Sequence, residues 1–172
     1  MITPSLRLLL LRHAQADHPP STSDYDRPLT ARGEDDAAGM GQYLAQEGLV
    51  PTLAIVSGSC RTRATWTRVQ QALPDVVPAI FDDRIYEAHQ DTLMDVLRGV
   101  ASASPVLMVV GHNPGMHRLA LQLVGRGGRN AYGRLAHDFP PAGLAVIDFD
   151  AAGWGAVSEH AGVLERFASP QR

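Results

Sequence analysis

Short, continuous apolar runs recur along the chain, and longer segments separate them. A short apolar run is typical of a strand that is buried on both faces. Between these runs, apolar residues recur at helical spacing, so predicted strands and helices alternate along the chain. The runs predict strands at residues 6–11, 53–56, 79–81, 106–110, 143–149 and 161–167.

The helical segments carry recognisable start signals. In the first of them, Met40, Tyr43 and Leu44 share one face, and Thr30 is a suitable N-cap residue. For the third, Asp91 is the expected N-cap residue. The spacing predicts helices at residues 30–46, 60–73, 92–100 and 116–124, and loops at residues 21–26, 125–129 and 131–141.

Strands that alternate with helices predict an α/β fold. Such chains form right-handed crossovers around a mainly parallel sheet, with helices on both faces. The expected architecture is therefore a three-layer αβα sandwich. Since the sequence shows no internal repeat and no linker-like segment, we expect residues 1–172 to form a single domain.

Composition and charge narrow the choice of partner. Hydrophobic residues make up 45% of the 172 residues and charged residues 19%, which supports a packed core and excludes disordered, collagen-like and coiled-coil chains. Fifteen basic and eighteen acidic residues give a net charge of −3. Because binding to a phosphate backbone usually needs a basic excess, nucleic acid is not the expected partner, although a local basic pocket is compatible with this balance.

The N-terminal segment imitates a secretion signal. The run Leu8–Leu11 precedes Ala14-Gln15-Ala16, but it is too short and Arg12-His13 interrupts it. Cys60 is the only cysteine, so no intramolecular disulfide can form. No apolar run approaches the roughly 18 residues of a membrane span. We therefore expect a cytoplasmic protein without a membrane partner.

Polar residues with useful chemistry follow the predicted strands. Arg12-His13 ends the first strand, Ser57 follows the second, four residues before Arg61, and His112 follows the strand 106–110. Ligands of open parallel sheets bind outside the carboxyl ends of the strands, where these residues would meet. His13 is then a candidate nucleophile and Arg12 a candidate anion clamp. An Arg-His pair at a strand end is also common in structural or solvated roles.

Two helix starts add independent evidence for an anion-binding site. Arg61 and Arg63 fall in the first turn of the second helix, where the helix dipole disfavours bases, so a bound anion would resolve the conflict. The alternative is a later helix start with both arginines solvated. Asn113 is a suitable cap and Pro114 suits the first helical position, which places His112 beside free backbone N–H groups that favour anions. The alternative there is a capped helix with an incidental histidine.

The histidines do not form a metal-binding pattern. His13 and His18 are five residues apart, as are His112 and His117, which does not place either pair on one helical face. The chain lacks an H-E-x-x-H motif and a cysteine pair. It also lacks nucleotide-binding glycine motifs and the G-x-S-x-G elbow of serine hydrolases. We therefore expect no metal and no cofactor.

Four segments, in order, resemble the motifs of the histidine phosphatase superfamily, also called the phosphoglycerate mutase-like superfamily. The R-P-L-T and G-H-N-P forms and the short length resemble its small bacterial SixA-type branch. The similarity spans about residues 6 to 125. Residues 11–14 resemble the R-H-G signature, 27–33 the L-T-x-x-G segment, 57–65 the S-x-x-x-R-x-x-x-T segment, and 111–113 the second-histidine motif.

This resemblance implies a phosphoglycerate mutase-like fold and site roles. His13 would become phosphorylated, and Arg12, Arg61 and His112 would bind the phosphoryl oxygens without a metal. The segment between Arg61 and His112 is too short for a large cap insertion, and Pro19 stands where mutases carry an asparagine. Another departure is an alanine, residue 14, where many members carry glycine.

The implied function is a phosphatase that forms a phosphohistidine intermediate and acts on phosphohistidine of a protein. A small-molecule phosphomonoesterase of the same superfamily is the alternative, and a phosphate-binding module without turnover is a third. The oligomeric state is left open.

The general acid is the least determined role. Glu87 is the candidate, because the family's acid often follows the third strand, and Asp82 and Asp83 are alternatives. Glu87 could equally be a surface or capping residue. A phosphohistidine substrate needs an acid less, because imidazole is a better leaving group than an alkoxide.

Overall fold

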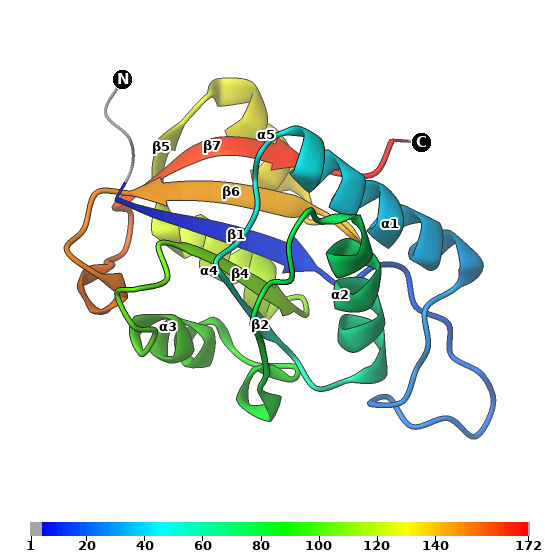
Figure 1. Ribbon diagram of the computed structural model, residues 1–172. Coiled ribbons are helices and arrows are strands. Elements are labelled where there is room, and N and C mark those ends of the chain that lie inside the picture. Colours follow the sequence, from blue (N-terminus) through cyan, green and yellow to red (C-terminus); the bar gives the residue numbers. More distant parts are fainter. Residues whose placement is uncertain (1–4, 172) are drawn as a thin grey trace.

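The computed structural model describes residues 5–171, and one seven-stranded sheet runs through it (Figure 1). The strand order is β3-β2-β4-β1-β6-β7-β5. All neighbours pair in parallel except β6, which is antiparallel to both β1 and β7, so the prediction of a mainly parallel sheet is confirmed. The strands are β1 (Leu6–Arg12), β2 (Leu53–Val56), β3 (Ala79–Phe81), β4 (Val106–Gly111), β5 (Val124–Gly127), β6 (Leu144–Phe149) and β7 (Gly162–Ala168).

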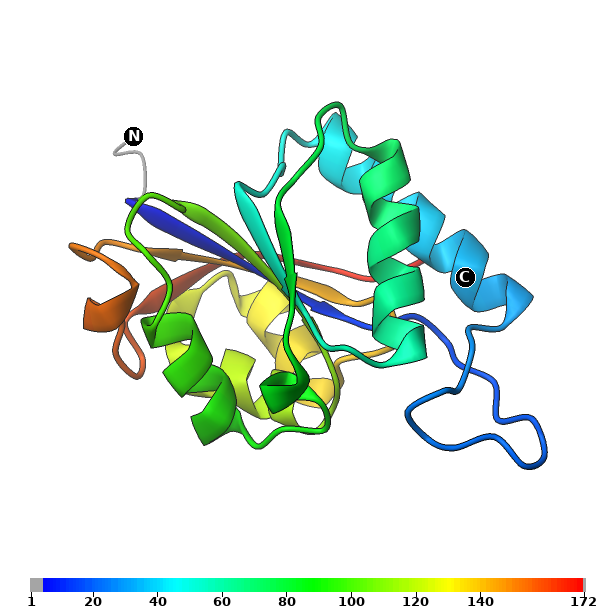
Figure 2. The same cartoon turned by 60° about the horizontal axis from the view of Figure 1, so that its bottom comes forward.

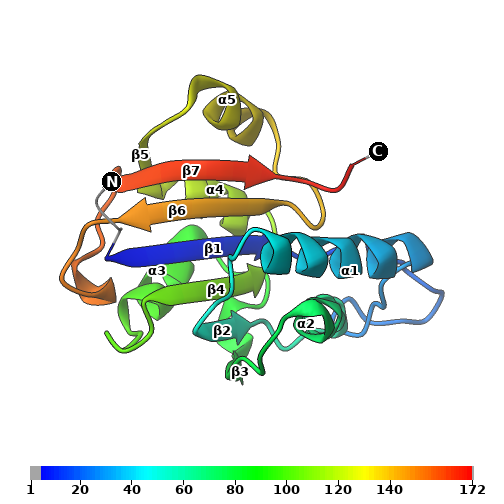
Figure 3. The ribbon, with the colours of Figure 1, turned by 45° about the horizontal axis from the view of Figure 1, so that its top comes forward.

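Helices cover both faces of the sheet, which confirms the three-layer αβα architecture (Figure 3). Helices α1 and α2 lie on one face, and α3, α4 and α5 on the other. Between α2 and β4, the chain forms β3, a short 3₁₀ turn and α3, which leaves no large cap insertion. The helices are α1 (Ala31–Gln46), α2 (Cys60–Ala72), α3 (Gln90–Arg98), α4 (Gly115–Leu123) and α5 (Arg129–His137).

Strand β1 shows why the apolar runs are continuous. Leu8 and Leu10 pack into the core beneath α3 and α4, whereas Leu9 and Leu11 pack against α1 and α2. Alternate side chains of a strand point to opposite faces, so a central strand between two helical layers needs apolar residues at every position. The first predicted strand is therefore buried on both faces.

The predicted N-cap of α1 is confirmed and that of α3 is wrong. The Thr30 hydroxyl accepts a hydrogen bond from the Gly33 N–H at 3.0 Å. Helix α3 begins earlier than expected, at Gln90, and His89 caps it by accepting from the Asp91 N–H at 3.3 Å. Asp91 lies in the first turn instead, where the helix dipole favours a carboxylate.

The prediction of a loop at residues 125–129 is wrong, and the loop predicted at residues 131–141 is confirmed only for residues 138–141. Residues Val124–Gly127 form β5, which pairs in parallel with β7, and Arg129–His137 form α5. Glycine has low strand and helix propensity, and it makes up most of residues 125–129 and interrupts α5 at Gly133, so the local pattern favoured loops. Pairing with β7 and burial of Leu135 decide them.

Two glycines of α1 provide a matched test of how closely this helix approaches the Gln15 backbone. A Cβ atom at Gly33 would overlap the Gln15 carbonyl oxygen, whereas one at Gly39 would meet nothing within 4 Å. Alanine favours a helix over glycine by about 1 kcal/mol. We expect Gly39→Ala to raise the free energy of unfolding by about 0.5–1 kcal/mol. Gly33→Ala should lower it by about 1–3 kcal/mol, as overpacking does.

Urea unfolding at equilibrium measures both changes. Stabilisation by both substitutions would contradict the close approach of α1 to the Gln15 backbone.

Candidate active site

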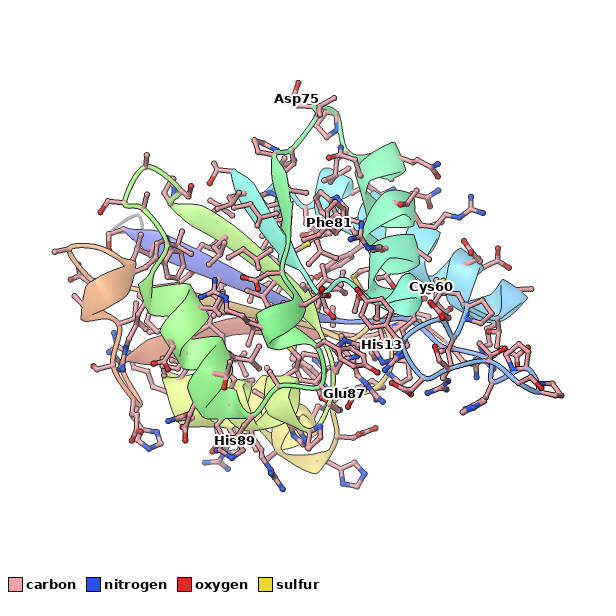
Figure 4. The ribbon with its side chains drawn as sticks, turned by 90° about the horizontal axis from the view of Figure 1, so that it is seen from below. His13, Cys60, Asp75, Phe81, Glu87 and His89 are labelled. Atoms are coloured by element: carbon pink, nitrogen blue, oxygen red, sulfur yellow. The ribbon has the colours of Figure 1, made fainter. Side chains whose placement is uncertain are left out.

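The predicted residues meet at one edge of the sheet, where β1, β2 and β4 end. Arg12 lies opposite Gly111 in the parallel register of β1 and β4, and the His13 N–H donates to the Gly111 carbonyl at 3.1 Å. Figure 4 shows His13 and Glu87 at this edge. The loop that joins β1 to α1 extends beside them, as Figure 2 also shows.

His13 is held as a neutral ring whose Nε2 atom carries no proton. Its Nδ1 atom lies 2.8 Å from the Ala14 carbonyl oxygen, which can only accept, so Nδ1 carries the proton. The Ala14 N–H in turn donates to the Thr65 hydroxyl at 3.0 Å. Burial, with smaller effects of Arg61 and Arg12, lowers the His13 pKa to about 4. Its Nε2 atom is therefore an unprotonated acceptor, and Arg61 Nε lies 3.4 Å from it.

Arg61 lies at the start of α2 and is 1% exposed. Its guanidinium donates to the Asp24 carbonyl at 2.6 Å, to the Asp24 carboxylate at 3.1 Å and to the Glu87 carboxylate at 2.6 Å. The expected conflict between a base and the helix dipole is thus offset by two carboxylates. A hydrogen bond from Tyr86, with that from Arg61, lowers the Asp24 pKa to about 2.

His112 presents one nitrogen to the site and one to the core. Its Nε2 atom lies 2.8 Å from the Ser57 hydroxyl, and its Nδ1 atom lies 3.5 Å from Glu87 Oε1. The ring is 2% exposed, and burial, followed by the charges of His13 and Arg61, lowers its pKa to about 3. The centres of the His13 and His112 rings are 5.3 Å apart.

Arg12 is anchored through only part of its guanidinium. One Nη atom donates to the Phe139 carbonyl at 3.0 Å, and burial lowers the Arg12 pKa. Among residues 5–171, Arg12 Nε and His112 Nδ1 are buried without a hydrogen-bond partner. Buried polar groups normally have partners, so two such unpaired groups in the site indicate room for a ligand that forms hydrogen bonds.

Of the three candidate acids, the structure brings only Glu87 to this group. Asp82 pairs with Arg84, and Asp83 accepts a hydrogen bond from Tyr25 at 2.7 Å. The Glu87 backbone has a φ of 50°, which is uncommon for a residue with a side chain. Such conformations often lie at functional sites.

Arg63 does not join the site. Its Nε atom donates to the Gly58 carbonyl at 2.7 Å, and its guanidinium lies 4.0 Å from the centre of the Phe81 ring. The first turn of a helix presents successive side chains in different directions, so only one of the two arginines can face His13.

The start of α4 also differs from the prediction. The cap position is Pro114 rather than Asn113, and the helix begins at Gly115. The Asn113 side chain still accepts from the His117 N–H at 3.2 Å. Its amide donates to the Phe139 carbonyl at 2.9 Å, the same oxygen that anchors Arg12.

Three residues at the site carried no functional prediction from the sequence. Asp24 and Tyr86 share a hydrogen bond above Arg61, and Thr65 supports the peptide after His13. Asp24 lies in a segment predicted only as a surface loop. Only Thr65 had a signal, because it ends the segment that resembles a superfamily motif.

Within residues 5–171, no group of three or more histidine, cysteine or acidic side chains is arranged to hold a metal ion. Over the same residues, no helix is both long and apolar enough to cross a membrane. A cytoplasmic location stays a prediction.

Comparison with known proteins identifies the family. The sequence profile of the histidine phosphatase superfamily (branch 1) matches residues 8–96, just over half of the 172 residues. An uncharacterized protein of Mycobacterium tuberculosis is 31% identical over 163 residues, which cover 94% of this chain and 100% of the relative.

Solved structures of similar fold point to the same family. A candidate phosphohistidine phosphatase, SixA of Agrobacterium tumefaciens, is 27% identical, with a TM-score of 0.81 over 98% of this chain and 100% of that one. A second SixA candidate, from Nakamurella multipartitia, is 24% identical and shares the fold, with a TM-score of 0.83 over 99% and 100% of the two chains. The chain therefore belongs to branch 1 of the histidine phosphatase superfamily and has a SixA-type structure.

Proposed function

We propose that this protein is a phosphatase that forms a phosphohistidine intermediate at His13 without a metal ion. The observation that carries the proposal is the state of His13. Its Nδ1 proton is held by the Ala14 carbonyl, its Nε2 lone pair is free of a proton, and that lone pair lies 3.4 Å from Arg61 Nε. A neutral, oriented imidazole beside cations is suited to attack an anionic phosphoryl group.

In the proposed first step, His13 Nε2 attacks phosphorus in line, and the bond to the leaving atom breaks as the N–P bond forms. Arg12, Arg61 and His112 hold the oxygens on which charge is spread, where most of the catalysis of phosphoryl transfer arises. A bound phosphoryl group would replace the Asp24 and Glu87 carboxylates on Arg61.

In the second step, water attacks phospho-His13, the N–P bond breaks and inorganic phosphate leaves. In this proposal, Glu87 exchanges the protons. Its carboxyl would donate to an alkoxide leaving group and then accept the proton of the attacking water. The lone pair of His13 is restored at the end of the cycle.

The openness of the site supports phosphohistidine on a protein as the substrate. No inserted domain separates α2 from β4, and the Glu87 side chain is 44% exposed although it contacts Arg61. An imidazole that projects from a protein surface could reach such a site. The likeness to the SixA candidate of Agrobacterium tumefaciens also supports this choice.

A small-molecule phosphomonoesterase is the second candidate, and the position of Glu87 favours it. An alkoxide leaves badly without a proton, so an acid beside the phosphoryl site would be useful mainly for phosphate esters. A module that binds phosphate without turnover is the third candidate. The oriented, unprotonated His13 argues against it, because binding alone needs no nucleophile.

The direct test compares a phosphohistidine-bearing protein with p-nitrophenyl phosphate, each with and without EDTA. We expect hydrolysis of both, a higher kcat/KM for the phosphohistidine protein, and no effect of EDTA. Loss of activity in EDTA would contradict a metal-independent route. A higher kcat/KM for small esters would favour the second candidate.

Replacement of Glu87 by glutamine separates the two enzyme functions. If Glu87 is the acid, Glu87→Gln should greatly reduce kcat/KM for alkyl phosphates, by about 10²–10⁴-fold. It should reduce hydrolysis of p-nitrophenyl phosphate less and of phosphohistidine least, because those leaving groups need less help from an acid. The basic limb of the pH profile for alkyl esters should also disappear.

Asp83→Asn is the matched control, since Asp83 binds Tyr25 and does not contact Arg61, His13 or His112. Equal losses on all three substrates in Glu87→Gln would assign Glu87 to binding or structure. No loss on any would mean that the reaction needs no acid from this residue.

A further inference from the structure

Within residues 5–171, the hydroxyl of Ser57 has one hydrogen-bond partner, His112. Ser57 directly follows β2 and is fully buried. Its hydroxyl lies 2.8 Å from His112 Nε2. Its backbone is held separately, since its N–H donates to the Val110 carbonyl at 3.1 Å and its carbonyl accepts from Thr62 at 2.6 Å. The hydroxyl is therefore not needed to anchor this turn.

This contact decides which nitrogen of His112 faces the candidate phosphoryl site. Because Nε2 is turned to Ser57, Nδ1 is the nitrogen that lies 3.5 Å from Glu87 Oε1. Among the described residues, Nδ1 is buried and has no hydrogen-bond partner. Glu87 Oε1 also lies 2.6 Å from Arg61, so this oxygen marks a place where an anion contacts both side chains.

A neutral imidazole has one donor nitrogen and one acceptor nitrogen. If His112 carried its proton on Nε2, the lone pair of Nδ1 would point at the phosphoryl oxygens and repel them. If the proton is on Nδ1, the ring donates to those oxygens, and Nε2 needs a donor of its own. Ser57 is the group placed to be that donor.

We propose that Ser57 is a positioning residue whose hydroxyl donates to His112 Nε2, so that the ring proton stays on Nδ1 and is directed at a phosphoryl oxygen. The inference rests on the proposed phosphatase function.

The two histidines would then share one tautomer and use it in opposite ways. In His13, the Nδ1–H donates to the Ala14 carbonyl, which leaves the Nε2 lone pair for attack. In His112, Ser57 occupies Nε2 and leaves the Nδ1 proton for binding. Which nitrogen each ring presents is set by the neighbour on its other side.

The test compares Ser57→Ala with Ser59→Ala. Ser59 is also fully buried, but its hydroxyl pairs with Thr62 at 2.7 Å and contacts neither histidine. Tungstate, a phosphate-like oxyanion, serves as the binding probe. Ser57→Ala should weaken tungstate binding about tenfold and lower kcat/KM about tenfold, the effect of one lost hydrogen bond. Ser59→Ala should stay within about threefold of the wild type, and Ser57→Thr, which keeps the hydroxyl, should recover most of the loss.

Nitrogen NMR of the histidine rings provides a readout that a merely structural role would not move. The wild-type protein without ligand should show His112 with its proton on Nδ1, and Ser57→Ala should lose that preference. A proton on Nε2 in the wild type would overturn the inference, as would equal losses in the two alanine variants. A wild type that hydrolyses no phosphate compound would refute the proposed function, and the NMR result would still decide the position of the proton.

Discussion

His13→Ala should abolish turnover and the formation of a phosphoenzyme while the protein stays folded. Removal of a nucleophile that forms a covalent intermediate lowers kcat by more than about a thousandfold. No neighbour can replace it, because the Nε2 lone pair of His13 is the one that Arg61 and the Ala14 contact orient. The measurement is incorporation of labelled phosphate, quenched under alkaline denaturing conditions that preserve the N–P bond.

His137→Ala is the matched control, since the His137 side chain is exposed at the end of α5 and, among the described residues, forms no hydrogen bond with His13. It should label and turn over as the wild type does. Label that persists on another residue of His13→Ala would exclude His13 as the nucleophile.

The lowered pKa of His13 adds a dependence on pH. Because the ring must be neutral to attack, kcat/KM should fall only as the pH drops toward about 4, well below the ordinary histidine value of 6.5. Stability should follow the same sign. The unfolded chain takes up a proton near pH 6.5 and the folded protein near 4, so the contribution of His13 is complete above 6.5 and is lost as the pH falls to about 4. In His13→Ala, this part of the acid destabilisation should be absent.

Arg61→Lys should lower kcat/KM by about 10²–10⁴-fold, although it keeps the charge. A lysine cannot reproduce the planar fork that binds two phosphoryl oxygens at once. Two lost charge-assisted hydrogen bonds correspond to about 3–6 kcal/mol. The KM should rise as well as kcat fall, since the fork would hold the substrate and the transition state.

The stability of Arg61→Lys depends on contacts that the helix position does not reveal. If the helix dipole alone decided the outcome, replacement of Arg61 in the first turn of α2 would leave the free energy of unfolding unchanged or raise it. The structure reverses this expectation, because Arg61 is buried and holds the Asp24 carbonyl and carboxylate. We expect a loss of about 1–3 kcal/mol in urea unfolding, the cost of leaving a buried polar group unpaired.

Arg63→Lys is the control, because Arg63 lies in the same helical turn and is directed to Gly58 and Phe81. It should leave kcat/KM near that of the wild type. Wild-type activity in Arg61→Lys would show that Arg61 does not bind the phosphoryl group.

The sequence alone determined most of the sheet. All six predicted strands are present, with ends shifted by at most one residue. This succeeded because a strand covered on both faces must be apolar at every position, as Leu8–Leu11 are, and the pattern is local. Most of the site could also be predicted from the sequence, since parallel strands place the residues after their carboxyl ends together. Arg12, His13, Arg61 and His112 do meet there.

Only the tertiary structure decided the rest, because those features depend on partners distant in sequence. Strand β5 exists through its pairing with β7, and its glycines carry no local signal. Asp24 reaches Arg61 only because the loop after β1 folds over the start of α2. The tautomer of a buried histidine follows from whichever group lies beside its second nitrogen, here Ser57 for His112, 55 residues away in the chain. Composition and periodicity determine which residues are buried, but the hydrogen-bond partners of a buried polar group are set by the assembled fold.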